Sequence, residues 1–173
     1  MNQCWMQSEG ILQDTKITKL LVKNLTEGIA LFWLPSSCFA FTNSTKALKE
    51  VVFVDSTSHV DQLNCYLMVM VCPSATGALP LAMLLTSGQS KQDYTEAFKL
   101  LQQTLGQESF FHQGYPSAFM TDDSEAKRGT LASIWPASKE FLCIFHILQA
   151  MWRWLWNAKN EVKLCDRKPL MKA

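Results

Sequence analysis

The order of the apolar, strand-like segments constrains the fold of this chain more than any other feature of its sequence. Residues 51–54, 64–72 and 81–86 are rich in β-branched and large apolar side chains and follow one another at short spacing. Two further strand patterns, residues 117–121 and 141–145, alternate with helical patterns. Consecutive strands predict an antiparallel meander, whereas strands separated by helices can join in parallel through right-handed crossovers. The sequence therefore predicts an α/β fold with a mixed sheet covered by helices.

A helical pattern precedes each of the two later strands, and a third follows the last strand. The first has apolar side chains three or four residues apart and ends at a glycine (Tyr94, Phe98, Leu101, Leu105, Gly106). The second occupies residues 124–134, ahead of Trp135 and Pro136. The third occupies residues 146–158. From residue 51 the predicted order is β-β-β-α-β-α-β-α.

The last of these helical patterns contains a group of tryptophans. Trp152 and Trp156 fall on one apolar face, so we expect both to pack in the core. Trp154 points elsewhere, beside Arg153, and aromatic side chains next to an arginine can also stack on nucleic-acid bases. The pattern therefore predicts a helix with one buried face.

Residues 1–50 give weaker signals. Apolar side chains between Ile17 and Leu25 recur near helical spacing with lysines among them, and they predict an amphipathic helix that ends near Gly28. Residues 29–34 predict a short buried strand that Pro35 ends. We therefore divide the chain into an N-terminal region of open assignment, a central domain and a C-terminal tail (residues 1–50, 51–158 and 159–173).

Composition excludes several classes of protein. Hydrophobic residues make up 48% of the 173 residues, which is enough for a core and argues against wholesale disorder. The net charge of +1 gives no global positive field, and no apolar stretch reaches the roughly 18–20 residues that a membrane span needs. The six cysteines are scattered, as is typical of reduced thiols in an intracellular protein. We expect no membrane segment.

Two of the predicted strands end at an aspartate. Asp55 follows residues 51–54, and Asp122 follows residues 117–121. If these strands are parallel neighbours, both carboxylates meet at the carboxyl edge of the sheet, where open α/β sheets bind ligands. Paired carboxylates suit Mg²⁺, and two such ions about 3.5–4 Å apart could hold the attacking and leaving oxygens of a phosphodiester. Each aspartate taken alone also fits a helix cap or a turn.

Three more residues near the strand ends are candidates. Asp123 is a candidate helix N-cap beside Asp122 and an alternative acid for the site. Cys143 and His146 form a Cys-x₂-His pair where a strand meets a helix, which is half of a tetrahedral zinc site. Two isolated residues are candidates for the other half (His112, Cys165). The alternative for the pair is a buried cysteine and a capping or core histidine.

Short motifs stand in a specific order along residues 51–157 of the chain. They are Val-Val-Phe-Val-Asp-Ser-Thr from Val51, Asn-Cys-Tyr from Asn64, Gly-Ala-Leu-Pro-Leu from Gly77, the helix containing Tyr94, Phe-Met-Thr-Asp-Asp-Ser-Glu-Ala from Phe119, Trp135-Pro136, and Cys-Ile-Phe-His from Cys143. No single motif is specific, but the ordered set resembles the Mutator-like (MULE) transposase domain. That resemblance implies an RNase H-like fold of the DDE class.

The resemblance also implies the chemistry of the site. Asp55 would be the first catalytic acid and metal ligand, and Asp122 the second. Cys143 and His146 match the CxxH signature of the family. The implied cofactor is Mg²⁺ or Mn²⁺, and the implied reaction is strand cleavage and transfer on transposon-end DNA in the nucleus.

The third acid of the family is where the chain departs from the pattern. In the family a glutamate follows a helical insertion well downstream of the CxxH signature, whereas this chain ends at Ala173. Glu161 lies too close to His146, on the same helical arm, so we do not assign the third role to it. We therefore expect a fragment with an incomplete C-terminal side that binds metal weakly and is inactive alone. The alternatives are a non-catalytic interaction or DNA-binding module of a domesticated transposase, including a homo-oligomer, and a small zinc domain.

Overall fold

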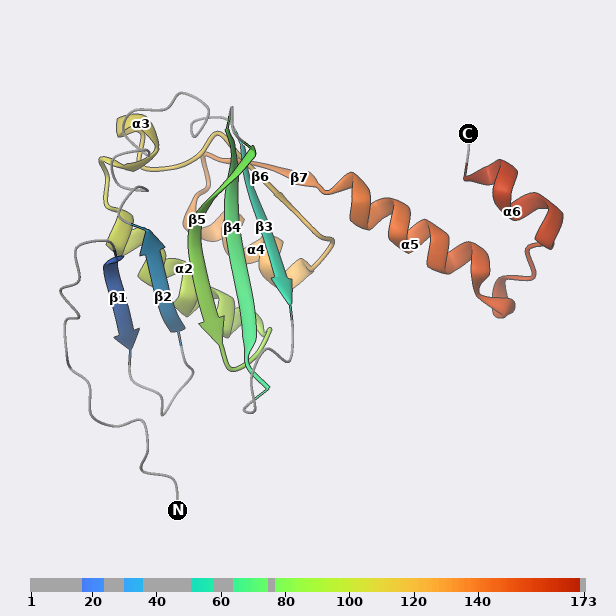
Figure 1. Ribbon diagram of the computed structural model, residues 1–173, viewed down its shortest axis with the longest axis horizontal. Helices are drawn as coiled ribbons and strands as arrows, with labels where there is room; N and C mark the ends of the chain where they lie inside the picture. Colours follow the sequence, from blue (N-terminus) through green and yellow to red (C-terminus); the bar gives the residue numbers. More distant parts are fainter. Residues whose placement is uncertain (1–16, 24–29, 36–50, 58–63, 75–76, 172–173) are drawn as a thin grey trace, which may run out of the picture.

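The structure is a computed structural model, and its strands form one sheet (Figure 1). The strand order is β1-β2-β5-β4-β3-β6-β7. Helices α2 (Lys91–Leu105) and α4 (Glu125–Ile134) lie against one face of this sheet, and α5 (Ile144–Trp156) extends away from it (Figure 1). The structure describes residues 17–23, 30–35, 51–57, 64–74 and 77–171.

Five of the strands make the mixed sheet that the sequence predicts. β3 (Val51–Thr57), β4 (Tyr66–Ser74) and β5 (Gly77–Thr86) pair antiparallel as a meander. β6 (Ala118–Thr121) and β7 (Lys139–Leu142) join in parallel on the other side of β3. Numbered from β3, the strand order is 3-2-1-4-5 with strands 1, 4 and 5 parallel, which is an RNase H-like topology. The predicted fold class is confirmed.

β5 begins earlier than the sequence indicates. Gly77 and Pro80 are residue types typical of a turn ahead of residues 81–86, but both lie within β5, and the register with β4 shifts between Met70 and Val71. The described pairs between β2 and β5 reach only from Leu85 to Met83, so Pro80 lies beyond that ladder. A register shift and an edge position both tolerate a residue that cannot donate a backbone hydrogen bond.

The predicted N-terminal helix is wrong. Residues Ile17–Lys23 form β1, which pairs antiparallel with β2 (Ala30–Pro35), and β2 pairs with β5. Ile, Thr and Val in β1 are β-branched and favour strands over helices, and pairing with a neighbouring strand outweighs the helical spacing of the leucines. The strand predicted to end at Pro35 is confirmed, whereas Leu25 and Gly28 lie outside the described residues.

Helix α2 begins and ends where local chemistry dictates. The Ser90 hydroxyl accepts a hydrogen bond from the Asp93 backbone N–H at 3.2 Å, and the Asp93 carboxylate accepts one from the Ser90 N–H at 2.8 Å. This capping box satisfies two donors that the helix leaves unpaired. Gly106, with φ of 70°, ends the helix as predicted. A short helix, α3 (Ser109–His112), follows before β6.

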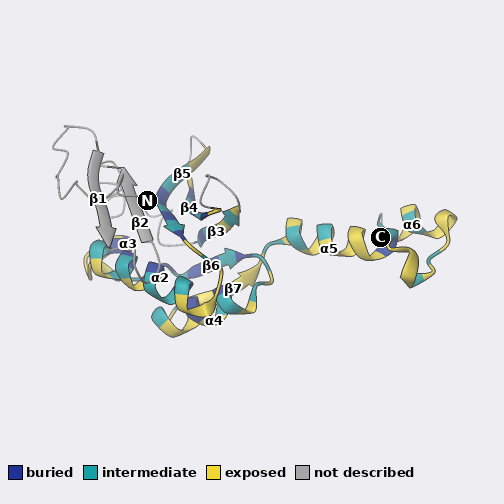
Figure 2. Cartoon of the chain, turned by 90° about the horizontal axis from the view of Figure 1, so that it is seen from below, coloured by how far each residue is buried: buried dark blue, intermediate teal, exposed yellow. Residues whose placement is uncertain are grey.

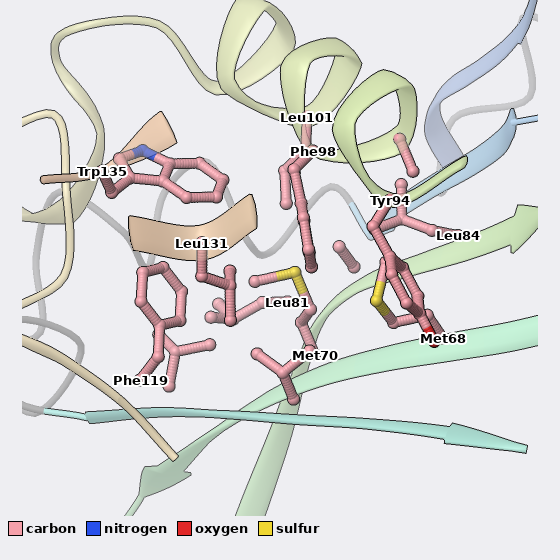
Figure 3. Close-up of a cluster of buried hydrophobic side chains, with 14 of the residues drawn as sticks. Met68, Met70, Leu81, Leu84, Tyr94, Phe98, Leu101, Phe119, Leu131 and Trp135 are labelled. Atoms are coloured by element: carbon pink, nitrogen blue, oxygen red, sulfur yellow. The ribbon is translucent and has the colours of Figure 1, made fainter. Parts of the chain in front are cut away.

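The core lies between the sheet and the helices α2 and α4 (Figure 3). Phe98 of α2 packs edge-on against Trp135, with ring centroids 5.9 Å apart, and Phe119 of β6 lies 5.3 Å from the same indole. The strands supply large unbranched side chains, among them Met68 and Met70, which point toward the helices (Figure 3). The predicted apolar face of α2 is therefore the face that covers the sheet.

The boundary between β7 and α5 differs from the predicted one. Residues 141–145 read as a strand, but β7 ends at Leu142 and α5 begins at Ile144. The helix then extends away from the sheet (Figure 2), followed by the 3₁₀ turn η2 (Ala158–Asn160) and α6 (Leu164–Leu170). The apolar run that suits a strand thus belongs partly to the first turn of a helix.

The apolar face of α5 is mostly exposed, so the expectation that Trp152 packs in the core is wrong. Trp152 is 47% exposed and stacks on Trp156, with ring centroids 3.7 Å apart. Trp154 is 56% exposed, while Leu155 is buried. The helical period correctly predicts a common face, but the helix carries that face away from the sheet (Figure 2).

The states of the cysteines and the lengths of the helices relate to two sequence-based expectations, reduced thiols and no membrane segment. Cys72 is buried, and burial raises the pKa of its thiol to about 11. Two backbone hydrogen bonds lower this pKa, but burial has the larger effect. Cys143 is half-buried and Cys165 is exposed, while Cys4 and Cys38 lie outside the described residues. No helix in the described part of the chain has an apolar stretch long enough to cross a membrane.

Candidate functional site

The two predicted acids stand at one edge of the sheet. β3 and β6 are parallel neighbours, and Val54 pairs with Thr121. Asp55 follows Val54 and Asp122 follows Thr121, so the parallel register places the two aspartates side by side along the backbone. The sequence predicted this adjacency from the residue that follows each apolar run.

Asp55 lies on the face of β3 opposite the helices. Val52 and Val54 are buried in the core, and side chains alternate along a strand, so Asp55 projects to the other face. Its side chain is 64% exposed. One carboxylate oxygen, Oδ1, accepts a hydrogen bond from the Ser56 N–H at 2.8 Å and lies 3.9 Å from Nε2 of His146. The first turn of α5 therefore approaches this carboxylate.

Asp122 instead turns toward α4, where it meets a buried lysine. Lys127, in the first turn of α4, has a side-chain exposure of 0%. Its Nζ donates to Oδ1 and Oδ2 of Asp122 at 3.0 and 3.1 Å, and to Oγ of Ser56 at 3.1 Å. Oδ1 also accepts hydrogen bonds from the Thr121 hydroxyl at 3.2 Å and the Ser124 N–H at 3.3 Å. Both oxygens of Asp122 are therefore engaged.

The surroundings of Asp122 stabilise its charged form. Burial has the largest effect and raises the pKa of this carboxyl group. The hydrogen bonds and positive charge of Lys127, together with the hydrogen bonds from Ser124 and Thr121, outweigh burial and lower the pKa below its ordinary value of 3.8. Asp122 is consequently ionised at neutral pH.

Asp123 does not cap helix α4, contrary to the sequence-based prediction. Ser124 is the N-cap residue, and its hydroxyl accepts a hydrogen bond from the Lys127 N–H at 3.4 Å. Asp123 is exposed and pairs with Arg128 at 2.9 Å. A serine in the extended conformation reaches the third N–H of the helix, which leaves the aspartate before it directed to solvent.

Cys143 and His146 lie where β7 passes into α5. Cys143 is the N-cap residue of α5, and its backbone N–H donates to the Thr121 carbonyl at 2.8 Å, which ties this corner to the end of β6. The His146 ring has Nε2 near Asp55, while its Nδ1 is buried without a hydrogen-bond partner in the described part of the chain. The CxxH pair is thus placed beside the acid edge.

The side chains around Asp122 do not suit a divalent metal ion. Among the described residues, no group of three or more histidine, cysteine, aspartate or glutamate side chains could hold a metal. Mg²⁺ binds carboxylate oxygens at about 2.0–2.1 Å, and both oxygens of Asp122 already accept hydrogen bonds from the Lys127 ammonium group. The residues as arranged do not fit a divalent ion on Asp122. His112, one candidate for a zinc site with Cys143 and His146, is exposed and pairs with Glu108 at 2.6 Å.

Sequence reasoning missed Lys127, although a signal for it exists. On a helix, residues three and four apart share a face. Lys127 therefore lies on the same face as Thr130 and Leu131, and all three are buried. The signal is a lysine at a position on the buried face of a helix, five residues after an aspartate that follows a strand. This arrangement indicates an internal ion pair.

Comparison with known proteins identifies the family. Residues 51–150 match the MULE transposase domain, and this stretch is more than half of the chain. It begins at β3 and includes Asp55, Asp122, Cys143 and His146. No match was found among curated proteins. With an RNase H-like sheet and a family match over most of its described strands, the chain belongs to the MULE transposase domain family.

Proposed function

We propose that this chain is a transposase-derived RNase H-like domain that carries the first two acids of a DDE site and does not cleave DNA by itself. The family match and the adjacency of Asp55 and Asp122 at one sheet edge support the ancestry and the assignment of the acids. The observation that carries the inactivity is the absence, among the described residues, of a third side chain that joins them in a group able to hold a metal.

The partner that follows from this proposal is DNA, in the form of transposon ends in the nucleus. Asp55 is exposed at the edge, so its carboxylate is accessible from solvent. Asp122 is held in the sheet by Lys127 and by its own strand end, and it acts there as a fixed internal anion. We propose that the chain presents this edge to DNA, and that cleavage of a phosphodiester needs metal ligands beyond Asp55 and Asp122.

The test is DNA binding measured together with DNA cleavage. The full chain is incubated with a fluorescent duplex for anisotropy, and with supercoiled plasmid in Mg²⁺ or Mn²⁺ for nicking. We expect binding that weakens as salt rises, because contacts to phosphates release counter-ions. We expect no nicking above the level without protein, because the described acids form no metal-binding group.

Three variants give this test its controls. Asp55→Ala and Asp122→Ala should leave the absence of nicking unchanged, and Asp123→Ala is the matched substitution at an exposed carboxylate outside the pair. Nicking by the wild-type chain that Asp55→Ala abolishes and Asp123→Ala preserves would show that the domain is an active nuclease. Absence of any DNA binding would remove DNA as the partner.

A second candidate function is a non-catalytic interaction module, and the exposed apolar side chains of α5 favour it. Ile144, Phe145, Ile147 and Trp154 are all large apolar side chains exposed on this one helix. Exposed apolar patches on soluble domains commonly mark interaction surfaces. We propose a second copy of the chain as the partner, because each copy presents the same apolar helix and like apolar faces are self-complementary.

Light scattering after size-exclusion chromatography tests this candidate. For the wild type we expect a mass above that of the monomer, and this mass should rise with protein concentration. Ile147→Glu should be a monomer, because association would bury the new carboxylate. The matched control is Phe141→Glu on β7, which is similarly exposed but does not lie on α5. A wild-type monomer at every concentration would count against this function.

A further inference from the structure

A wholly buried lysine lies beside the acid edge. Lys127 is among the largest fully buried side chains in the described part of the chain, together with Phe98 and Phe119. Lysine is almost never fully buried unless its charge is paired, because an ammonium group is costly to remove from water. Apolar packing therefore does not account for this residue, and its charge has a role.

The ammonium group lies among oxygens that belong to the two strands of the acid edge. Lysine has three protons to donate, and three oxygens lie at 3.0–3.1 Å from Nζ: both carboxylate oxygens of Asp122 and the hydroxyl of Ser56. The ring of Tyr94 lies on α2 with its centroid 5.9 Å away, within reach of a cation–π contact. A cation with oxygen ligands thus already lies between the end of β6 and β3.

The start of α4 fixes the lysine in this position. Ser124 caps the helix and accepts a hydrogen bond from the Lys127 N–H, so the backbone of Lys127 belongs to the first turn. Side chains in a helix point back toward its N-terminus, which is where Asp122 lies. The ion pair is therefore local, between residues five apart, and it forms wherever this strand-to-helix corner folds.

Other charges nearby are engaged elsewhere. Arg128, the next residue, lies 2.9 Å from Asp123 and 3.6 Å from Glu140, and it is partly exposed. Asp55 is on the opposite face of the sheet, with His146 at 3.9 Å. In the described part of the chain, Lys127 is thus the cation that Asp122 contacts.

We propose that Lys127 is a built-in counter-ion that takes the place of a divalent metal on Asp122, so that this acid does not bind Mg²⁺ or Mn²⁺ while the lysine is present. An ammonium group at 3.0–3.1 Å from both carboxylate oxygens opposes metal binding there, because the two cations repel one another and the ammonium hydrogen bonds occupy lone pairs that a metal would use. The inference concerns the same acid as the proposed function, but it depends neither on transposase ancestry nor on DNA.

The test is Mn²⁺ binding to the full chain, measured by electron paramagnetic resonance and by calorimetry. Lys127→Met keeps the length and apolar stem of the side chain. We expect it to bind Mn²⁺ at least about tenfold more tightly than the wild type, because the ammonium charge that repels Mn²⁺ at Asp122 is gone. The matched control is Lys99→Met, the same substitution at an exposed position on α2. It should leave Mn²⁺ binding at the wild-type level.

A double variant locates the effect. Asp122→Asn combined with Lys127→Met should lose the gain in Mn²⁺ binding, because the carboxylate that receives the metal is absent. Mn²⁺ should also raise the melting temperature of Lys127→Met more than that of the wild type, since a ligand that binds only the folded state stabilises it. A lysine that merely fills space would change the melting temperature without changing its dependence on Mn²⁺.

Two results would overturn the proposal. One is a wild-type chain that binds Mn²⁺ as tightly as Lys127→Met, and the other is a gain that persists in the double variant. If Lys127→Met does not fold, Lys127→Gln, which retains a donor without the charge, replaces it. If neither variant folds, the wild type decides: Mn²⁺ binding that Asp122→Asn abolishes contradicts the proposal, and no binding supports it.

Discussion

At the scale of single residues, the acid edge is shaped by which partner each aspartate has. Asp55 and Asp122 follow paired positions of parallel strands, yet one carboxylate faces His146 and the other faces Lys127. Alternation along β3 sends Asp55 away from the helices, whereas the helix cap at Ser124 brings Lys127 to Asp122. Backbone adjacency alone therefore does not make two carboxylates share a ligand.

The ion pair between Asp122 and Lys127 also affects stability. Asp122→Asn leaves the buried ammonium group without its counter-charge, and breaking a buried ion pair in this way costs about 3–5 kcal/mol. Because the Asp122 side chain is 28% exposed, we expect about 3 kcal/mol, the lower end of that range. The free energy of unfolding in urea at pH 7 measures the loss.

The same pair predicts how that loss depends on pH. The pKa of Asp122 is lowered in the folded state, so its stabilising effect is present above the ordinary value of 3.8 and is lost as pH falls through the folded pKa. The difference between the wild type and Asp122→Asn should stay constant from neutral pH down to about pH 5 and shrink below 3.8. Asp123→Asn, at an exposed carboxylate, should cost less than about 1 kcal/mol. An equal cost for both variants would contradict the role of the buried pair.

At the scale of helices and strands, the sequence correctly predicts those elements whose apolar residues recur with the spacing of the face that packs in the core. The strands β3 to β7 and the helices α2 and α4 were all predicted in type and order, and all of them except β7 contribute buried residues to the core. β1 was predicted as a helix because its leucines have helical spacing, and the strand forms because its backbone pairs with β2. The pairing of β1 with β2 depends on a second segment, so residues 17–23 taken alone carry no signal for it.

Parts of the site were predictable for the same reason. Asp122 follows β6 and Asp55 lies within β3 directly after the apolar residues 51–54, so their position side by side follows from the apolar pattern once the strands are parallel neighbours. The Cys143 and His146 corner was also placed correctly, between β7 and α5. Lys127 was missed because its partner lies in the turn before its helix, and only the cap geometry brings the two together.

At the scale of the whole molecule, the sheet crosses the boundary that the sequence suggests at residue 51. The family match begins there, but β2 pairs through Leu31, Phe32 and Trp33 with β5, the third strand of the seven-stranded order. A strand that pairs with the sheet belongs to it structurally whatever its family assignment. The described strands β1 and β2 therefore extend the sheet beyond the residues of the family match.

A chain that begins at Val51 tests this contribution. Removing β1 and β2 uncovers the backbone N–H and C=O groups of β5, and an open sheet edge pairs readily with other chains. With a net value of about 0.5–1.5 kcal/mol for each lost hydrogen bond, we expect the free energy of unfolding to fall by about 2–4 kcal/mol, and light scattering to report association. The matched truncation removes residues 161–173, which include α6, a helix with no buried residue, and should change neither property by more than about 0.5 kcal/mol. If the chain from Val51 were as stable as the full chain and associated no more strongly, the domain would begin at β3, and β1 and β2 would be an appendage to the sheet.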